Sequence, residues 1–189
     1  MASSVKIVAV ALDFDGVIAN LEVDWNEVIR KISKTAGQDI KSLLTFYEAN
    51  FGVPIYQKVS AEIENIELEA LKNTQLVPFI GEFLKSLQEK QMPVYVVSMQ
   101  TAKVIQVYLN QQGLSSYIKE VVTRDRFPSK RAQVDYVTKT AGGRVLFVDD
   151  LKRNLISCQG LNVECFHFQR TKKPKDAQKS WDKILELIK

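Results

Sequence analysis

The sequence contains few of the side chains that most often bind metals through nitrogen or sulfur. Its 189 residues include one histidine and two cysteines. A site of several histidines is therefore excluded, and a Ser-His-Asp or Cys-His mechanism would have to use His167, which we expect to be a structural or surface residue. Cys158 and Cys165 lack the spacing of metal ligands and lie among apolar residues. This pattern predicts two packed, reduced thiols and a cytoplasmic protein.

Long apolar runs and strong net charge are also missing. The first apolar run reaches Asp13 too soon for a signal peptide or a membrane span, so we expect no membrane partner. The net charge of +4 suits an anionic ligand but is too small to indicate nucleic acid. The basic stretch 170–175 lacks interleaved aromatic residues and is interpreted as solvated surface.

Three short apolar runs each end in acidic or hydroxyl residues. They are 8–12 before Asp13 and Asp15, 94–97 before Ser98, and 145–148 before Asp149 and Asp150. Such runs are typical of buried strands in a parallel sheet, whose carboxyl ends form the ligand-binding edge. Carboxylates that crowd together need a cation or protons to offset their repulsion. The pattern therefore predicts a Mg²⁺ site that handles phosphate.

Apolar runs and helical patterns alternate along most of the chain. Strands are expected near 6–12, 94–98, 118–122, 145–149 and 163–168, with helices near 80–89, 102–112, 130–140 and 151–159 and around Trp181. This alternation predicts an α/β fold with a Rossmann-like parallel sheet of about five strands, covered by helices on both faces.

A helical stretch of more than fifty residues separates the first two strands, where one crossover helix would suffice. A capping box at Asp24 and Glu27 predicts the start of its first helix. We therefore expect a catalytic core of 1–20 and 77–189, with a small helical cap at 21–76.

Phosphoryl transfer to a carboxylate needs a nucleophile, an acid for the leaving group, a cation and donors for the phosphoryl oxygens. Asp13 and Asp15 can share one site if the chain turns at Gly16. Ser98 can donate to a phosphoryl oxygen, and Lys130 at a helix start can neutralise charge.

These residues carry a resemblance to a known family. Asp13-Phe14-Asp15-Gly16, then Ser98, Lys130 and Asp149-Asp150, resemble in order the four motifs of the haloacid dehalogenase (HAD) superfamily of phosphohydrolases. The stretch 77–81 resembles the family's turn into the helix after the cap, and 108–123 resembles its phosphoglycolate-phosphatase-like branch, which has a cap after the first strand.

The resemblance implies a Mg²⁺-dependent phosphatase for a small phosphorylated metabolite. Asp13 would attack phosphorus to form an aspartyl-phosphate, and Asp15 would serve as acid and then as base. Asp13, the Asp15 carbonyl and Asp150, with Asp149 beside it, would bind Mg²⁺. Ser98 and Lys130 would hold the phosphoryl group.

The sequence departs from the family pattern in two places and leaves other functions open. Arg131 stands where proline often follows the lysine, and Asp149-Asp150 with a later Asn154 leaves open which aspartate binds the metal. A phosphomutase or phosphotransferase, a phospho-accepting receiver and a non-catalytic phosphate-binding protein are the alternatives. The receiver is disfavoured because in receivers the lysine comes after all the aspartates, whereas here Lys130 precedes Asp149 and Asp150. The protein is expected to be a monomer or homodimer.

Overall fold

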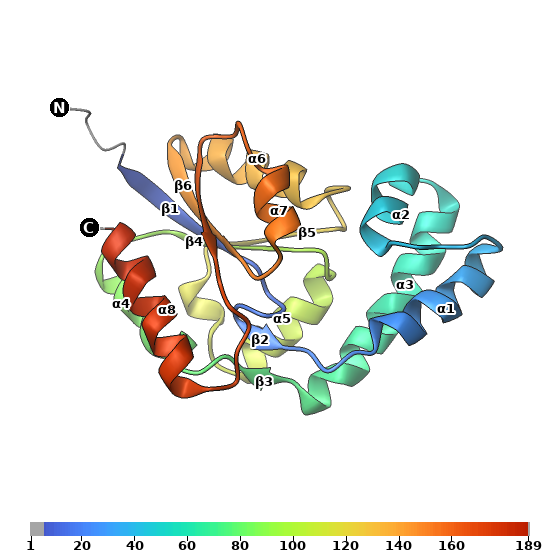
Figure 1. Ribbon diagram of the computed structural model, residues 1–189, viewed down its shortest axis with the longest axis horizontal. Helices are drawn as coiled ribbons and strands as arrows, with labels where there is room; N and C mark the ends of the chain where they lie inside the picture. The colour runs from blue at the N-terminus through green and yellow to red at the C-terminus, as the bar shows by residue number, and fades with distance from the viewer. Residues whose placement is uncertain (1–5, 189) are drawn as a thin grey trace.

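The computed structural model describes residues 6–188, and its centre is a parallel β-sheet (Figure 1). The strand order is β5-β4-β1-β6-β7, and every neighbouring pair is parallel. The strands are β1 Ile7–Leu12, β4 Val94–Ser98, β5 Glu120–Thr123, β6 Arg144–Asp149 and β7 Val163–His167. This sheet confirms the predicted α/β class. Residues 1–5 and Lys189 lie outside the described residues. The expectation that the N-terminus holds no signal peptide falls partly on these residues.

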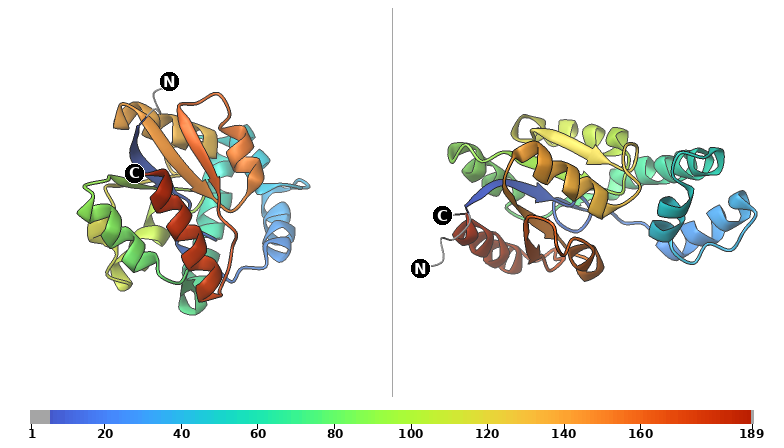
Figure 2. Two further views of the ribbon diagram at one scale, coloured as in Figure 1. Left: turned by 60° about the vertical axis from the view of Figure 1, so that its left-hand side comes forward. Right: turned by 90° about the horizontal axis from the view of Figure 1, so that it is seen from above.

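Alternating residues of the strands face two separate hydrophobic clusters, because successive strand side chains point to opposite faces. On β1, Val10 and Leu12 belong to one cluster, and Ala9 and Ala11 to the other. The first cluster includes α4 Ile80–Glu89, α5 Ala102–Gln111 and α8 Pro174–Leu187, and the second includes α6 Lys130–Ala141 and α7 Lys152–Ser157. Helices therefore cover both faces of the sheet (Figure 2).

The first three helices after β1 form a unit to one side of the sheet (Figures 1 and 2). They are α1 Trp25–Ala36, α2 Leu43–Asn50 and α3 Pro54–Ala70, and a short 3₁₀ turn, η1 Leu71–Asn73, follows. Their apolar faces meet in a third hydrophobic cluster that includes Ile32, Phe46 and Ile63. The Asp24 side chain accepts bonds from the second and third backbone N–H groups of α1, as its capping position predicts.

Two short strands join this helical unit to the sheet. β2 Ala19–Asn20 pairs antiparallel with β3 Gln75–Leu76, so both chain connections run side by side. The sequence did not predict this pair, because two-residue strands leave no periodic pattern. β5 also begins at Glu120, two residues later than expected, because Ser115–Tyr117 forms a 3₁₀ turn, η2, before it.

The expectation of two packed thiols is half right. Cys158 is buried, but Cys165 is exposed. Its strand, β7, is an edge strand of the sheet, so its outer side has no neighbouring strand to cover it. His167 on the same strand is exposed, as expected. Among residues 6–188, no helix combines the length and apolar character that crossing a membrane requires.

Candidate active site

Lys130 links the ends of three neighbouring strands. It is the first residue of α6, and its Nζ donates to Asp13 Oδ1 at 2.8 Å and to the Val97 carbonyl at 2.7 Å. Its Nζ also lies 3.6 Å from Asp149 Oδ2. Burial lowers the pKa of Lys130, but the attraction of the two aspartates outweighs burial and leaves the pKa raised. Lys130 is therefore a buried, charged group directed at the end of β1.

Three aspartates crowd around this lysine. Carboxylate oxygens of Asp13, Asp149 and Asp150 all lie within 4.8 Å of one another. Burial and then the repulsion of Asp13 raise the pKa of Asp149, and the same causes raise the pKa of Asp150 to about 6. Lys130 carries one positive charge against these three carboxylates, and the next cation, Arg170, approaches Asp150 only to 3.8 Å. Oxygen donors at this spacing fit a hard divalent cation such as Mg²⁺.

A tight turn after Asp13 brings the chain against Asp150. Gly16 has a φ of +88°, and its N–H donates to the Ala19 carbonyl at 2.7 Å. A Cβ at Gly16 would lie 2.2 Å from Asp150 Oδ2. Only glycine satisfies both the backbone angle and this close approach. The absence of a side chain at Gly16 thus leaves a space, the cradle, in which the Asp150 carboxylate lies next to the turn.

The two adjacent aspartates have different surroundings. Asp149 is fully buried and accepts bonds from the Leu151 N–H at 2.8 Å and from Asn154 Nδ2 at 3.0 Å. Asp150 instead lines the cavity described below. Asp149 is therefore held by Lys130 and Asn154, whereas Asp150 is the carboxylate open to a ligand.

Ser98, at the end of β4, is fully buried. Its hydroxyl donates to Gln100 Oε1 and accepts from the Gln100 N–H at 3.2 Å, and its carbonyl accepts from Gln133 Nε2 at 2.7 Å. Gln100 lines the cavity, whereas Ser98 does not. The structure thus brings Ser98 to the correct edge of the sheet but places Gln100 between its hydroxyl and the cavity.

Asp15 is held by a residue from the far end of the chain. Arg170 Nη2 donates to Asp15 Oδ1 at 2.6 Å, and Arg170 Nη1 donates to Oδ2 at 3.3 Å. The Leu21 N–H also donates to Oδ1, at 2.9 Å. Burial raises the pKa of Asp15, and the attraction of Arg170 offsets part of this rise.

A cavity of about 340 Å³ lies between these carboxylates and the helical unit. The core contributes polar residues to its wall, and α1 and α2 contribute mainly apolar ones. The lining includes Asp13, Asp15, Gln100, Lys130, Asp150 and Arg170 from the core, and Trp25, Ile29, Leu43, Leu44 and Tyr47 from the helices. The cavity can therefore hold a ligand between a charged floor and a roof that is mainly apolar but also contains Lys41, Ser42 and Glu67.

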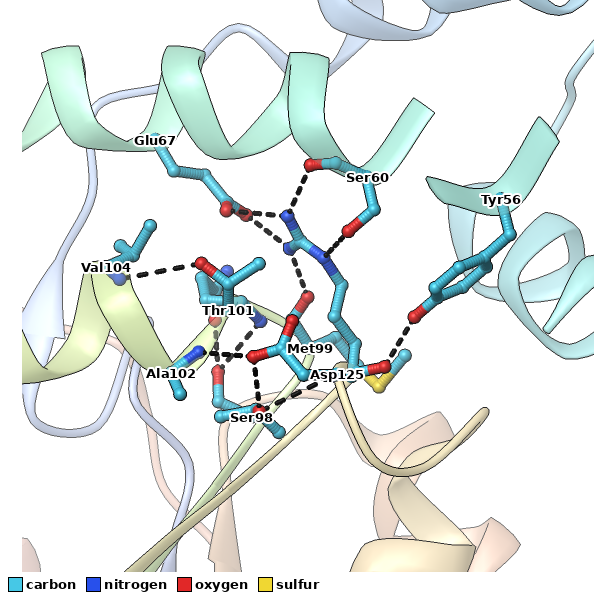
Figure 3. A network of polar contacts seen from close by, with 12 residues as sticks. Tyr56, Ser60, Glu67, Ser98, Met99, Thr101, Ala102, Val104 and Asp125 are labelled. Atoms are coloured by element: carbon cyan, nitrogen blue, oxygen red, sulfur yellow. Dashed lines mark hydrogen bonds and ion pairs between the residues drawn. The ribbon is translucent and has the colours of Figure 1, made fainter. Parts of the chain in front are cut away.

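A buried arginine, Arg124, connects the helical unit to the core through Glu67 and Ser60. Figure 3 shows these two partners on the same helix. Arg124 follows β5, and its Nη1 and Nη2 donate to the two carboxylate oxygens of Glu67 on α3 at 2.9 and 3.0 Å. Its remaining N–H groups donate to the Ser60 hydroxyl, the Ser60 carbonyl and the Met99 carbonyl. All five guanidinium donors are thus satisfied.

Sequence reasoning missed Gln100, Glu67, Arg124 and Arg170. Two signals were available. Arg124 directly follows β5, so the rule that was used for Asp13 places it at the same edge of the sheet. We interpreted the basic stretch 170–175 as solvated surface, and it is largely exposed, but Arg170 also contacts Asp15 across 155 residues of sequence.

Sheet topology and the placement of the carboxylates define an α/β enzyme with a helical insertion after its first strand. The sequence model of the haloacid dehalogenase-like hydrolases matches residues 10–168. The chain therefore belongs to this family of hydrolases. A search of curated proteins found no match.

Solved structures share the fold over nearly the whole chain. A predicted phosphoglycolate phosphatase from Haemophilus somnus superimposes with a TM-score of 0.66 at 16% identity, covering 99% of this chain and all of that one. A HAD-superfamily hydrolase from Geobacter sulfurreducens gives 0.63 at 17% identity, covering 100% and 99%. A predicted phosphatase from Clostridium acetobutylicum gives 0.64 at 15%, covering 96% and 100%. At these identities the likeness concerns the fold.

Proposed function

We propose that this protein is a Mg²⁺-dependent phosphatase that hydrolyses a small phosphate monoester through an aspartyl-phosphate on Asp13. The observation that carries the proposal is the Lys130–Asp13 bond at 2.8 Å, which lies among two further carboxylates at the floor of the cavity. The family assignment supports hydrolysis, and the lysine offers a positive charge to a phosphoryl group.

Asp13 and Asp15 divide the chemistry between them. The Asp13 carboxylate attacks phosphorus while the ester P–O bond breaks, and Asp15 gives its proton to the leaving oxygen. Asp15 then takes a proton from a water molecule whose oxygen attacks the phosphorus. The bond between Asp13 and phosphorus breaks, which regenerates Asp13 and releases inorganic phosphate.

The carboxylate cluster is suited to the cation that this reaction needs. Asp13, Asp150 and the Asp15 carbonyl would hold Mg²⁺, with Asp149 behind them orienting Lys130. When bound, the ion neutralises charge on the phosphoryl oxygens and on the carboxylates. The cradle at Gly16 supports this role for Asp150, because a side chain there would displace its carboxylate.

Ser98 and Lys130 are proposed to hold the phosphoryl group. Lys130 is already directed at Asp13. Ser98 would exchange its bond to Gln100 for one to a phosphoryl oxygen, and Gln100, which lines the cavity, would move with it. Residues 21–76 would act as the cap and 1–20 with 77–189 as the core, because the helices of 21–76 roof the cavity and limit its contact with water.

Phosphate release from a panel of small phosphate esters tests this function. We expect Mg²⁺-dependent turnover by the wild type and a loss of at least about a thousandfold in Asp13→Asn, because the nucleophile is gone. Asp182→Asn, an exposed change on α8, serves as the matched control and keeps full activity.

Other products would point to other functions. Transfer of the phosphoryl group to an added alcohol or sugar rather than to water would assign a phosphotransferase or phosphomutase. Phosphate binding without turnover would assign a binding protein. A cytoplasmic setting, a lack of nucleic-acid partners and a monomeric or homodimeric state stay predictions from the sequence.

A further inference from the structure

The basic segment after β7 is largely exposed, as expected, and it also lies along the first connection to the helical unit. Arg170 Nη2 donates to the Leu21 carbonyl at 3.1 Å, and the Thr171 carbonyl accepts from Asn20 Nδ2 at 3.3 Å. Lys172 completes the contact through an ion pair with Glu22. Three consecutive residues of the segment therefore contact residues 20–22.

Arg170 is the member of this segment that reaches the site. Its two terminal nitrogens contact both carboxylate oxygens of Asp15, and its Nη1 lies 3.8 Å from Asp150 Oδ2. The main chain of Leu21 links the two side chains in a ring of hydrogen bonds, because the Leu21 N–H donates to Asp15 and the Leu21 carbonyl accepts from Arg170. Asp15 and Arg170 both line the cavity.

We propose that Arg170 is a positioning residue that fixes the carboxylate of Asp15 toward the leaving group of the substrate. This inference rests on the proposed function. A carboxylate on a single methylene can rotate about two bonds, and one N–H donor fixes only one of its oxygens. A two-point contact with a planar guanidinium fixes the plane of the carboxylate as well. Lysine, with a single charged nitrogen, cannot reproduce this contact.

The chemistry of the leaving group gives the role a specific signature. Asp15 must pass its proton to an alkoxide-like oxygen as the P–O bond breaks, and such transfer depends on placement. A nitrophenolate leaves without needing that proton. Misplacing Asp15 therefore slows alkyl phosphates more than nitrophenyl phosphate. A change that merely loosens the fold slows both equally.

The test compares leaving groups in three variants. Values of kcat/KM, which report the step that forms the aspartyl-phosphate, are measured with Mg²⁺ for p-nitrophenyl phosphate and for a series of alkyl phosphates of rising alcohol pKa. In Arg170→Gln we expect about a 10- to 100-fold loss on the alkyl esters, mainly in kcat, and a several-fold smaller loss on the nitrophenyl ester. Arg170→Lys should recover only part of the loss.

Lys172→Gln is the matched control from the same segment. Its partner Glu22 is an exposed residue outside the cavity lining. We expect this variant to keep both the wild-type rates and the wild-type dependence on the leaving group. Thermal unfolding of all three variants checks that each is folded at the assay temperature.

Several outcomes would overturn the proposal. Equal losses on all esters would make Arg170 a structural residue, and unchanged rates would make its contact with Asp15 incidental. A rise confined to KM, with the leaving-group dependence unchanged, would make it a substrate-binding residue. An inactive wild type would remove the proposed function itself, which is a different result from an active wild type whose variants show no change in leaving-group dependence.

Discussion

Two buried clusters of charge lie beside the same cavity, and they differ in how completely their charges are matched. Around Lys130, two cations, Lys130 and Arg170, face four carboxylates, and oxygens of three of these carboxylates lie within 4.8 Å of one another. Around Arg124, one cation faces Glu67, and every guanidinium donor has an acceptor. The first cluster leaves negative charge for a ligand to neutralise, and the second leaves none. The cluster with excess negative charge is thus the candidate active site, and the cluster with balanced charge joins the helical unit to the core.

This difference predicts opposite responses to the removal of one charged group. A group taken from the matched cluster leaves its partner buried and alone, which destabilises the fold. A carboxylate taken from the unmatched cluster relieves repulsion when no cation is bound. The predictions below test each side of the comparison.

Arg124→Met should have the largest effect on stability. Glu67 is 1% exposed, so its charge would be left buried without its partner. Breaking such a pair costs about 3–5 kcal/mol of the free energy of unfolding, measurable by urea denaturation. Changing Glu67 to Met as well should recover most of the loss, because no buried charge then remains. If the double variant is as unstable as the single one, the packing of the arginine matters and not its charge.

Gly16→Ala tests the cradle of the unmatched cluster. The new Cβ would have to displace Asp150, and the φ of +88° adds strain of about 1–3 kcal/mol. We expect a loss of tenfold or more in activity and a higher Mg²⁺ concentration for half-maximal rate.

Gly52→Ala is the matched control for this change. Gly52 has a φ of +81° with nothing within 4 Å of its Cβ position. Its substitution by alanine therefore adds backbone strain but displaces no neighbouring side chain. Equal Mg²⁺ dependence in the two variants would show that Asp150 does not need its place against Gly16.

The pH dependence of stability should reveal the repulsion among the aspartates. In the folded protein the pKa of Asp150 is about 6 rather than 3.8, and the pKa of Asp149 is also raised. The metal-free folded protein then binds more protons than the unfolded chain between these values, so its stability falls as the pH rises through about 6. Urea denaturation in a chelator across this range measures the fall.

Two comparisons make this measurement decisive. Mg²⁺ should restore stability at the high end of the pH range, because a ligand that binds only the folded state stabilises it. Asp150→Asn should flatten the metal-free pH profile. A metal-free protein that gains stability as the pH rises through this range would contradict the claim that these aspartates repel one another when no cation is bound.

The sequence predicted one of these clusters and not the other, for a physical reason. Asp13, Ser98 and Asp149 follow apolar runs, and parallel strands bring their carboxyl ends to one edge whatever the loops do. The sheet and the meeting of these residues with Lys130 could therefore be predicted.

The pairing of Arg124 with Glu67 follows no such rule. Arg124 comes directly after β5, but Glu67 lies 57 residues earlier on α3, and the sequence does not distinguish a charge that will be buried from one that will face water. The same holds for Arg170 and Asp15, because a contact across 155 residues depends on how the last loop packs. Pairings of this kind depend on tertiary packing, which local patterns do not encode.

Glu69→Gln should have the smallest effect and is the strictest test of what burial contributes. Glu69 lies two residues from Glu67 on the same helix, and its 2.6 Å bond to Lys72 is shorter than the 2.9 Å bond between Arg124 and Glu67. Glu69 is 71% exposed, so water solvates both partners once the pair is broken. We expect less than about 0.5 kcal/mol of change in the free energy of unfolding by urea denaturation, against several for Glu67→Gln. A loss at Glu69 as large as that at Glu67 would mean that distance, and not burial, governs ion pairs in this protein.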